Sequence, residues 1–282
     1  MTAKLFKLQF REVWRIIRIL IPLTFLFILL TSAAALLQIG FITGLLTTFT
    51  MVMIIGSAFV LYALVVMNDY QNMQGKRAYF VRSIPAKPGE LFTSRLLYYV
   101  SFFLIGIIAL LAELFTLVFL MTQAEDGGGM TLIRSFLDQV AEFFPMIGLI
   151  LLSYVVIMIL LNVLSFMFAI SIGSEAKFRH LGIGGPVVVY IIYYIAMQVL
   201  TLVSMFVIPI GVRFDAYATS PTDANIRLVR ESMLPQFIKM IRDGIEPTEP
   251  VIGIGIIPFV IIAVFVLGWV TYRSMSRRLT LN

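Results

Sequence analysis

One carboxylate, that of Glu113, lies within a long apolar run, where it could contact a substrate or a proton inside a membrane. Glu113 is the one residue ionisable at neutral pH within the long apolar runs of this 282-residue chain. Burying a charge in hydrocarbon is costly, so such residues usually face a cavity or a charged or polar partner. Two interpretations follow from its position. Glu113 either contacts a substrate or a proton, or it is a carboxyl group bonded to a neighbouring Tyr, Ser or Arg.

Other catalytic patterns are missing from the sequence. His180 is the only histidine and the chain has no cysteine, which excludes paired-histidine and thiolate metal sites and cysteine nucleophiles. No G-x-S-x-G elbow and no G-x-x-x-x-G-K-[ST] phosphate loop occurs. We therefore expect no enzyme, no metal, no bound cofactor and no nucleotide hydrolysis by this chain. Its basic character is juxtamembrane and gives no reason to expect nucleic acid as a partner.

The elements that position Glu113 are expected to be membrane-spanning helices. Apolar residues make up 60% of the chain, and the mean hydropathy is +1.01. Runs of about 20 or more apolar residues are long enough to cross a bilayer as helices. The sequence predicts an all-α integral membrane protein with six spans, at residues 19–37, 45–67, 96–123, 145–172, 183–210 and 251–272.

The distribution of Lys and Arg predicts how the spans are oriented. With the N-terminus inside, inner segments hold 15 of the 21 basic residues, in agreement with the positive-inside rule. Both termini are then cytoplasmic, and residues 124–144 and 211–250 form the larger extracytoplasmic loops. We expect the protein in the plasma membrane.

Glycines and prolines predict where helices begin, bend and end. The uncharged residues 38–44 predict a tight hairpin, and Gly127–Gly129 predict a break before a short amphipathic helix that leads to residue 144. A second short helix is expected over residues 226–242, interrupted near Pro235. Pro145 and Pro186 are expected at helix starts, where proline is tolerated. Pro258 is expected to kink the last span.

The first 18 residues predict an amphipathic helix on the inner leaflet. Basic residues recur at helical spacing opposite an apolar stripe, and Trp14 suits the headgroup level. The basic residues are Lys4, Lys7, Arg11, Arg15 and Arg18. Ordinary positive-inside flanking charge is the alternative interpretation. A cleaved signal peptide is disfavoured, because the apolar run that follows is of spanning length.

Residues 68–95 form a basic cytoplasmic loop between the second and third spans. Phe80 and Ile84 share one helical face beside Lys76 and Arg77. Pro85 then ends that helix, since its ring removes a donor and clashes with the preceding turn. Pro88 starts the next helix in a favoured first-turn position. The pattern predicts a compact helix–turn–helix that leads directly into the third span.

This arrangement resembles the six-span membrane permeases of the type-two ABC transporter family. The matching features are the N-terminal helix, six spans with both termini inside, and the sequence GKRAYFVRSIPAKPGELFTSRLL at residues 75–97. The resemblance implies that residues 1–282 form one permease domain and that the loop is a coupling helix docking on a separate ATPase subunit. The implied docking residues are Gly75, Lys76, Arg77, Tyr79, Phe80, Arg82, Ile84, Pro85 and Pro88.

The same resemblance implies partners and a substrate class. A second permease copy or a homologue completes the membrane pathway, and ATP and Mg²⁺ bind in the partner ATPase. The exported substrate is expected to be amphipathic, peptide-like or lipid-like, and membrane lipids surround the chain. Two other classes stay open: an ion-gradient-driven secondary transporter that uses Glu113, and a non-catalytic membrane immunity or scaffold protein.

Overall fold

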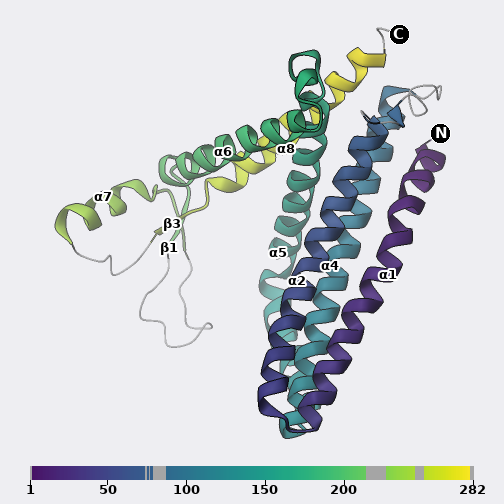
Figure 1. Cartoon of the computed structure of the whole chain (residues 1–282). Coiled ribbons are helices and arrows are strands. Elements are labelled where there is room, and N and C mark those ends of the chain that lie inside the picture. Colours follow the sequence, from purple (N-terminus) through teal and green to yellow (C-terminus); the bar gives the residue numbers. More distant parts are fainter. Residues whose placement is uncertain are drawn as a thin grey trace. The chain divides into compact units, whose positions relative to one another are not determined.

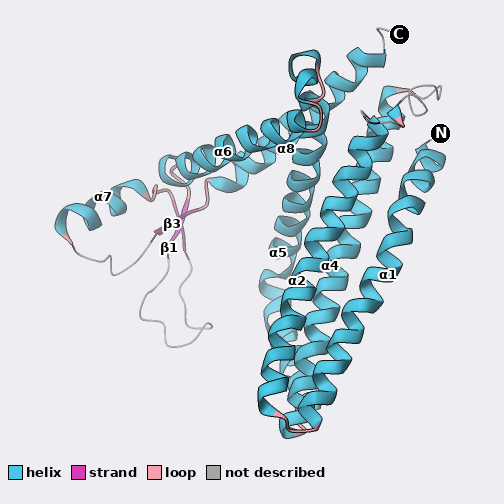
Figure 2. Ribbon diagram, viewed as in Figure 1, coloured by secondary structure: helices cyan, strands magenta, loops and turns pink. Residues whose placement is uncertain are grey.

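The computed structural model describes residues 2–73, 75, 77–78, 87–213, 227–244 and 251–279. Six of its helices are long and apolar enough to cross a membrane, which is the character of a multi-pass membrane protein. The chain divides into two compact units, Met1–Val163 with Tyr272–Asn282, and Leu164–Thr271. Helices dominate both units, and the strands lie in the second one (Figures 1 and 2).

The first unit is built on three long helices that pack against one another. They are α1 (Thr2–Leu36), α2 (Gly40–Met73) and α4 (Pro88–Asp126), which lie side by side in Figure 1. A turn at Leu37–Ile39 joins α1 to α2, and Gln38 adopts a positive φ of 54° there. The expected tight hairpin is therefore confirmed.

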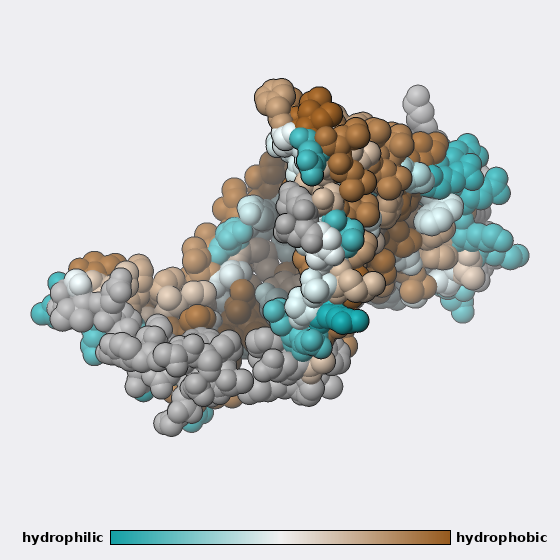
Figure 3. Space-filling view, turned by 90° about the horizontal axis from the view of Figure 1, so that it is seen from below, coloured by the Kyte–Doolittle hydropathy of each residue, from teal (hydrophilic) through white to brown (hydrophobic). Residues whose placement is uncertain are grey.

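The interior of this bundle is mostly apolar. Ile28, Ile54 and Leu117 form a cluster shielded from solvent, one residue from each helix. Two buried hydroxyls pair across helices, those of Thr31 and Thr50, 2.7 Å apart. Hydrophobic side chains also cover much of the outer surface, as Figure 3 shows for one face. Such a surface suits lipid rather than water as the surrounding medium.

A glycine turn connects α4 to the fourth long helix. Gly127 ends α4 with a positive φ of 66°, and α5 (Gly129–Gly173) begins two residues later. The predicted break at Gly127–Gly129 is confirmed. The amphipathic segment before residue 144 is not a separate helix, because α5 continues through Pro145 without interruption. Our prediction that a helix begins at Pro145 is therefore wrong.

The second unit combines helices with a small antiparallel sheet. It contains the 3₁₀ helix η1 (Ala176–Leu181), α6 (Gly184–Val207), α7 (Leu234–Asp243) and the first part of α8 (Ile256–Leu279). The strands β1 (Gly211–Arg213), β2 (Arg227–Val229) and β3 (Val251–Gly253) pair in the order β2-β1-β3. The expected start of a helix near Pro186 is confirmed.

Two predictions in this region are wrong. Residues 227–229 form strand β2, so the expected helix over residues 226–242 is shorter: Pro235 lies in the first turn of α7 instead of interrupting a helix. Residues 251–253 form β3, so Pro258 falls in the first turn of α8 and produces no mid-span kink. The physical reason is the same in both places, because proline is compatible with the first helical turn.

The predicted separate helix over residues 1–18 is also wrong. Residues 2–36 form one helix, and its N-terminal half buries Leu5, Val13 and Ile17 within the bundle. Phe10 stacks on Phe102 of α4 with ring centroids 4.7 Å apart. The apolar stripe that suggested contact with a membrane surface therefore packs against the protein's own helices.

Candidate functional site

The structure places some of the expected docking residues and leaves others outside the described part of the chain. Gly75 follows the end of α2 and donates its N–H to the Tyr70 carbonyl over 3.1 Å. Pro88 lies in the first turn of α4, as expected. The residues outside the described ranges are Lys76, Tyr79, Phe80, Arg82, Ile84 and Pro85.

A capping interaction stabilises the N-terminus of α4, which follows the docking segment. The Glu90 carboxylate accepts a hydrogen bond from the Lys87 backbone N–H over 3.2 Å. A negative charge in the first turn also interacts favourably with the helix dipole. The start of α4 at Pro88 is thus set by local chemistry, as the sequence predicted.

Below this segment, α2 and α4 are joined by a buried ion pair. Arg95 Nε donates to Asp69 Oδ1 over 2.9 Å, and Arg95 Nη2 donates to Asp69 Oδ2 over 2.5 Å. The two side chains are 1% and 0% exposed. This bidentate geometry is the strongest way in which a guanidinium binds a carboxylate.

Further hydrogen bonds surround the pair. Tyr99 donates its hydroxyl to Asp69 Oδ2 over 2.9 Å, and Arg95 Nη1 lies 3.5 Å from the sulfur of Met275. Next to them, Asn68 Nδ2 donates to the Tyr98 hydroxyl, which donates to the Val65 carbonyl, each over 3.2 Å. A network with this many satisfied groups fixes the relative position of the two helices. We refer to Asn68, Asp69, Arg95, Tyr98 and Tyr99 as the anchor network.

Sequence reasoning missed the anchor network. Asp69 and Arg95 were counted as charges of the loop, although both lie in helices that extend beyond the predicted spans. One signal was present: Arg95, Tyr98 and Phe102 recur at spacings of three and four residues, which places a charge on an otherwise aromatic, buried face. A charge on such a face needs a buried counter-charge.

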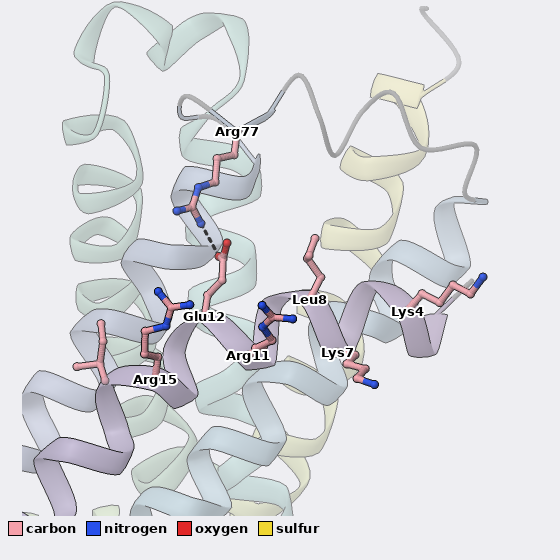
Figure 4. Close-up of a pocket in the computed structure, with 8 residues that line it drawn as sticks. Lys4, Lys7, Leu8, Arg11, Glu12, Arg15 and Arg77 are labelled. Carbon is pink, nitrogen blue, oxygen red and sulfur yellow. Dashed lines mark hydrogen bonds and ion pairs between the residues drawn. The ribbon is translucent and has the colours of Figure 1, made fainter.

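A second cluster lines a groove beside the first helix. The groove has a volume of about 640 Å³ and is lined by Lys4, Lys7, Leu8, Arg11, Glu12, Arg15, Ile16 and Arg77. Figure 4 shows Arg77 reaching from the segment after α2 towards Glu12 of α1, with which it forms an ion pair. Because Arg77 and Glu12 neutralise each other, four basic side chains of α1 set the net charge of this basic groove.

Two residues expected with that cluster lie beside it. Trp14 is 41% exposed and stacks on Phe10 with ring centroids 5.6 Å apart. Arg18 is exposed one turn further along α1. The six residues expected near the membrane surface thus lie on one helix.

Glu113 lies in the interior of the first unit. Its side chain is 1% exposed and is hydrogen-bonded to the Thr24 hydroxyl of α1. It lines neither the basic groove nor a second cavity of about 570 Å³ near the α1–α2 turn, whose polar lining is uncharged: Gln38, Thr43, Thr47 and Thr48. The bonded-carboxyl interpretation thus has an observed partner, although that partner is a threonine.

Within the described ranges, no group of three or more His, Cys, Asp or Glu side chains is arranged to hold a metal ion. His180 is exposed in η1. No protein-family model matches the chain, and neither the curated proteins nor the solved structures contain a match. Any functional conclusion therefore rests on the residues and their geometry.

Proposed function

We propose that this chain is the permease subunit of an ATP-driven ABC exporter. It forms the membrane pathway together with a second copy or a homologue, and a separate ATPase subunit binds residues 75–88. ATP and Mg²⁺ bind in that partner, since this sequence has no phosphate loop. The exported substrate is amphipathic, peptide-like or lipid-like.

The anchor network is the observation that carries this proposal. A docking segment can transmit movement only if it is attached firmly to the helices that must move. Here α2 ends four residues after Asp69, and α4 begins seven residues before Arg95. The buried bidentate pair therefore joins the two helices that flank the segment, so that both ends of the segment are attached to one rigid base.

This base gives the proposed coupling a mechanical route. When ATP binding closes the partner subunits, residues 75–88 are displaced with them, and the displacement reaches α2 and α4 together. Rigid-body movement of packed helices is a common way in which a local binding event changes a distant site. The long spans can then alternate their exposure to the two sides of the membrane.

The basic residues of the segment indicate that the docking surface of the partner is acidic. Lys76, Arg77, Arg82 and Lys87 outnumber the acidic Glu90 between residues 75 and 90. Charge complementarity of this kind raises association rates and selects the partner more than it sets the final affinity. Apolar contact by Phe80 and Ile84 is expected to supply most of the binding energy.

Co-purification from the native membrane tests the proposal. The wild-type chain is expected to carry a nucleotide-binding subunit, and Phe80→Asp or Pro85→Gly is expected to lose it while still inserting into the membrane. His180→Asp is the matched control, because it adds the same charge to another exposed segment on the expected cytoplasmic side. Normal ATPase recovery with both loop variants would contradict the docking assignment.

Transport assays separate the other two classes. An ion-gradient-driven transporter would work alone in proteoliposomes and would lose activity in Glu113→Gln. The permease proposed here keeps its transport in that variant, because a glutamine side chain can still accept the hydrogen bond from Thr24. An immunity or scaffold protein would retain its partner through the segment at residues 211–250 and need no ATPase.

A further inference from the structure

We propose that the basic groove is a binding site for an anionic phospholipid of the leaflet at the N-terminal end of α1. The proposal does not depend on an ATPase partner. It rests on three features of α1: the arrangement of its cations, the tether to Arg77, and the apolar surface that continues from the groove along the same helix face.

The cations of the groove are spaced to surround one anionic group. Lys4, Lys7, Arg11 and Arg15 are exposed and recur every three or four residues, so they lie along one side of the helix. Arginine and lysine side chains both bind phosphate oxygens, and arginine does so with two parallel N–H donors. A single phosphate can thus be contacted by neighbouring side chains from successive turns.

Arg77 closes the groove from a second element. It is held over α1 by its ion pair with Glu12, and both residues line the groove. Glu12 is the one acidic residue among those eight lining residues, and its charge is offset by Arg77. The groove therefore presents net positive charge to whatever enters it.

The surface beyond the groove identifies the ligand as a lipid. Exposed apolar side chains continue along the cation-bearing side of α1 at spacings of three and four residues: Pro22, Leu26, Leu29, Ala33 and Leu36. From Pro22 to Leu36 the helix rises by roughly 20 Å, somewhat more than the depth of one leaflet, which is about 15 Å. A phosphate above and an acyl chain below match the two ends of this face.

A soluble phosphate compound would use only the upper half of this surface. The exposed apolar stripe would then have no part in binding. Since charged headgroup and acyl chain are both accommodated, an anionic phospholipid fits the whole face better than free phosphate does. Zwitterionic lipids share the acyl chain but lack the net charge that the cations select.

Tryptophan quenching can measure the selectivity directly. The chain has two tryptophans, so Trp269→Phe leaves Trp14, which lies on α1 between Arg11 and Arg15, as the only tryptophan. The full chain would be reconstituted in bilayers with brominated phosphatidylglycerol or brominated phosphatidylcholine. We expect stronger quenching by phosphatidylglycerol at equal mole fraction, because the anionic lipid is enriched at the groove.

Charge removal then locates the site. Each basic side chain near a membrane surface contributes about fivefold in affinity for anionic lipid. Lys7→Gln/Arg11→Gln/Arg15→Gln is therefore expected to lose roughly a hundredfold in selectivity. The matched control, Arg230→Gln/Lys239→Gln/Arg242→Gln, removes the same charge from exposed positions in the second unit and is expected to keep it.

A double substitution tests the geometry of the groove rather than its total charge. Arg77→Gln removes a cation and leaves Glu12 facing the phosphate. This variant should therefore lose more selectivity for anionic lipid than Lys4→Gln does. Adding Glu12→Gln should restore part of the selectivity. These two variants also decide the question if the triple variant fails to insert.

Three results would overturn the proposal. The first is a triple variant that retains its selectivity, and the second is a control that loses as much as the triple variant does. The third is loss of selectivity in millimolar glycerol 3-phosphate as complete as the loss caused by unbrominated phosphatidylglycerol, which would identify a free-phosphate site. Competition by the intact lipid alone would support the lipid assignment.

Discussion

Asp69 and Arg95 carry opposite charges at a place from which solvent is excluded. Such a pair contributes little net stability over an apolar pair of similar size, because both ions lose their hydration. Removing only one partner is different, since it leaves an uncompensated buried charge. The Asp69–Arg95 pair therefore acts mainly as a geometric constraint on α2 and α4.

This asymmetry gives a prediction for single and double substitutions. Asp69→Asn should destabilise the protein by about 3–5 kcal/mol, because the Arg95 guanidinium loses its counter-charge. Asp69→Leu/Arg95→Met should cost much less, since no charge is then buried. The thermal stability of the purified protein, followed by size-exclusion chromatography after heating, measures both.

The outcome distinguishes stability from coupling. Tyr99→Phe is the matched control: it removes one hydrogen bond to Asp69 and should cost about 1.5–3 kcal/mol. A double variant as unstable as Asp69→Asn would contradict the argument. If the double variant folds but loses the dependence of transport on ATP, the anchor network has the mechanical role proposed for it.

The sequence predicted some local effects of single residues correctly, although the effects expected of Pro145, Pro235 and Pro258 were wrong. The helix start at Pro88 and the break at Gly127 follow from backbone chemistry, and both were confirmed. Partners separated by many residues could not be predicted in this way. Asp69 and Arg95 are 26 residues apart, and only the packing of α2 on α4 brings them together.

Helices are the elements that the sequence predicted best, although their ends were often misplaced. All six apolar runs appear as helices, but α1, α4 and α5 extend well beyond the predicted spans. Hydropathy marks the part of a helix that lipid requires and does not mark where the backbone stops being helical. Residues 2–18 continue the helix because their apolar stripe packs on α4, which hydropathy alone does not reveal.

Close backbone approach in the second unit predicts a sensitive position. A Cβ added at Gly173, the last residue of α5, would lie too close to the backbone of Gly185 and Pro186 at the start of α6. Gly173→Ala should therefore destabilise the protein by about 1–3 kcal/mol, the usual range for overpacking. Heating followed by size-exclusion chromatography gives the measurement.

A neighbouring glycine supplies the control. A Cβ added at Gly184 would meet only the Leu181 Cβ, at an ordinary 3.7 Å. Gly184→Ala should leave the thermal stability unchanged or slightly raised, since alanine favours the helical state. Equal stability of the two variants would show that α5 and α6 do not approach through Gly173.

For the molecule as a whole, the proposed function requires a particular orientation. The docking segment must face the cytoplasm, where ATPase subunits and the Lys/Arg excess of membrane proteins are found. The charge distribution predicts this orientation, and the helices supply the required number of crossings. A direct determination of sidedness therefore tests the permease assignment.

The absence of cysteine makes that determination simple. Single cysteines can be introduced at exposed positions and labelled in intact cells with a membrane-impermeant maleimide. Lys239→Cys on α7 should be labelled at once, whereas His180→Cys in η1 and Lys87→Cys before α4 should react only after permeabilisation. Labelling of His180→Cys and Lys87→Cys in intact cells would show that the protein has the opposite orientation in the membrane. The 75–88 segment could not then meet a cytoplasmic ATPase, and the permease assignment would fall, while the basic groove would face the opposite leaflet and keep its chemistry.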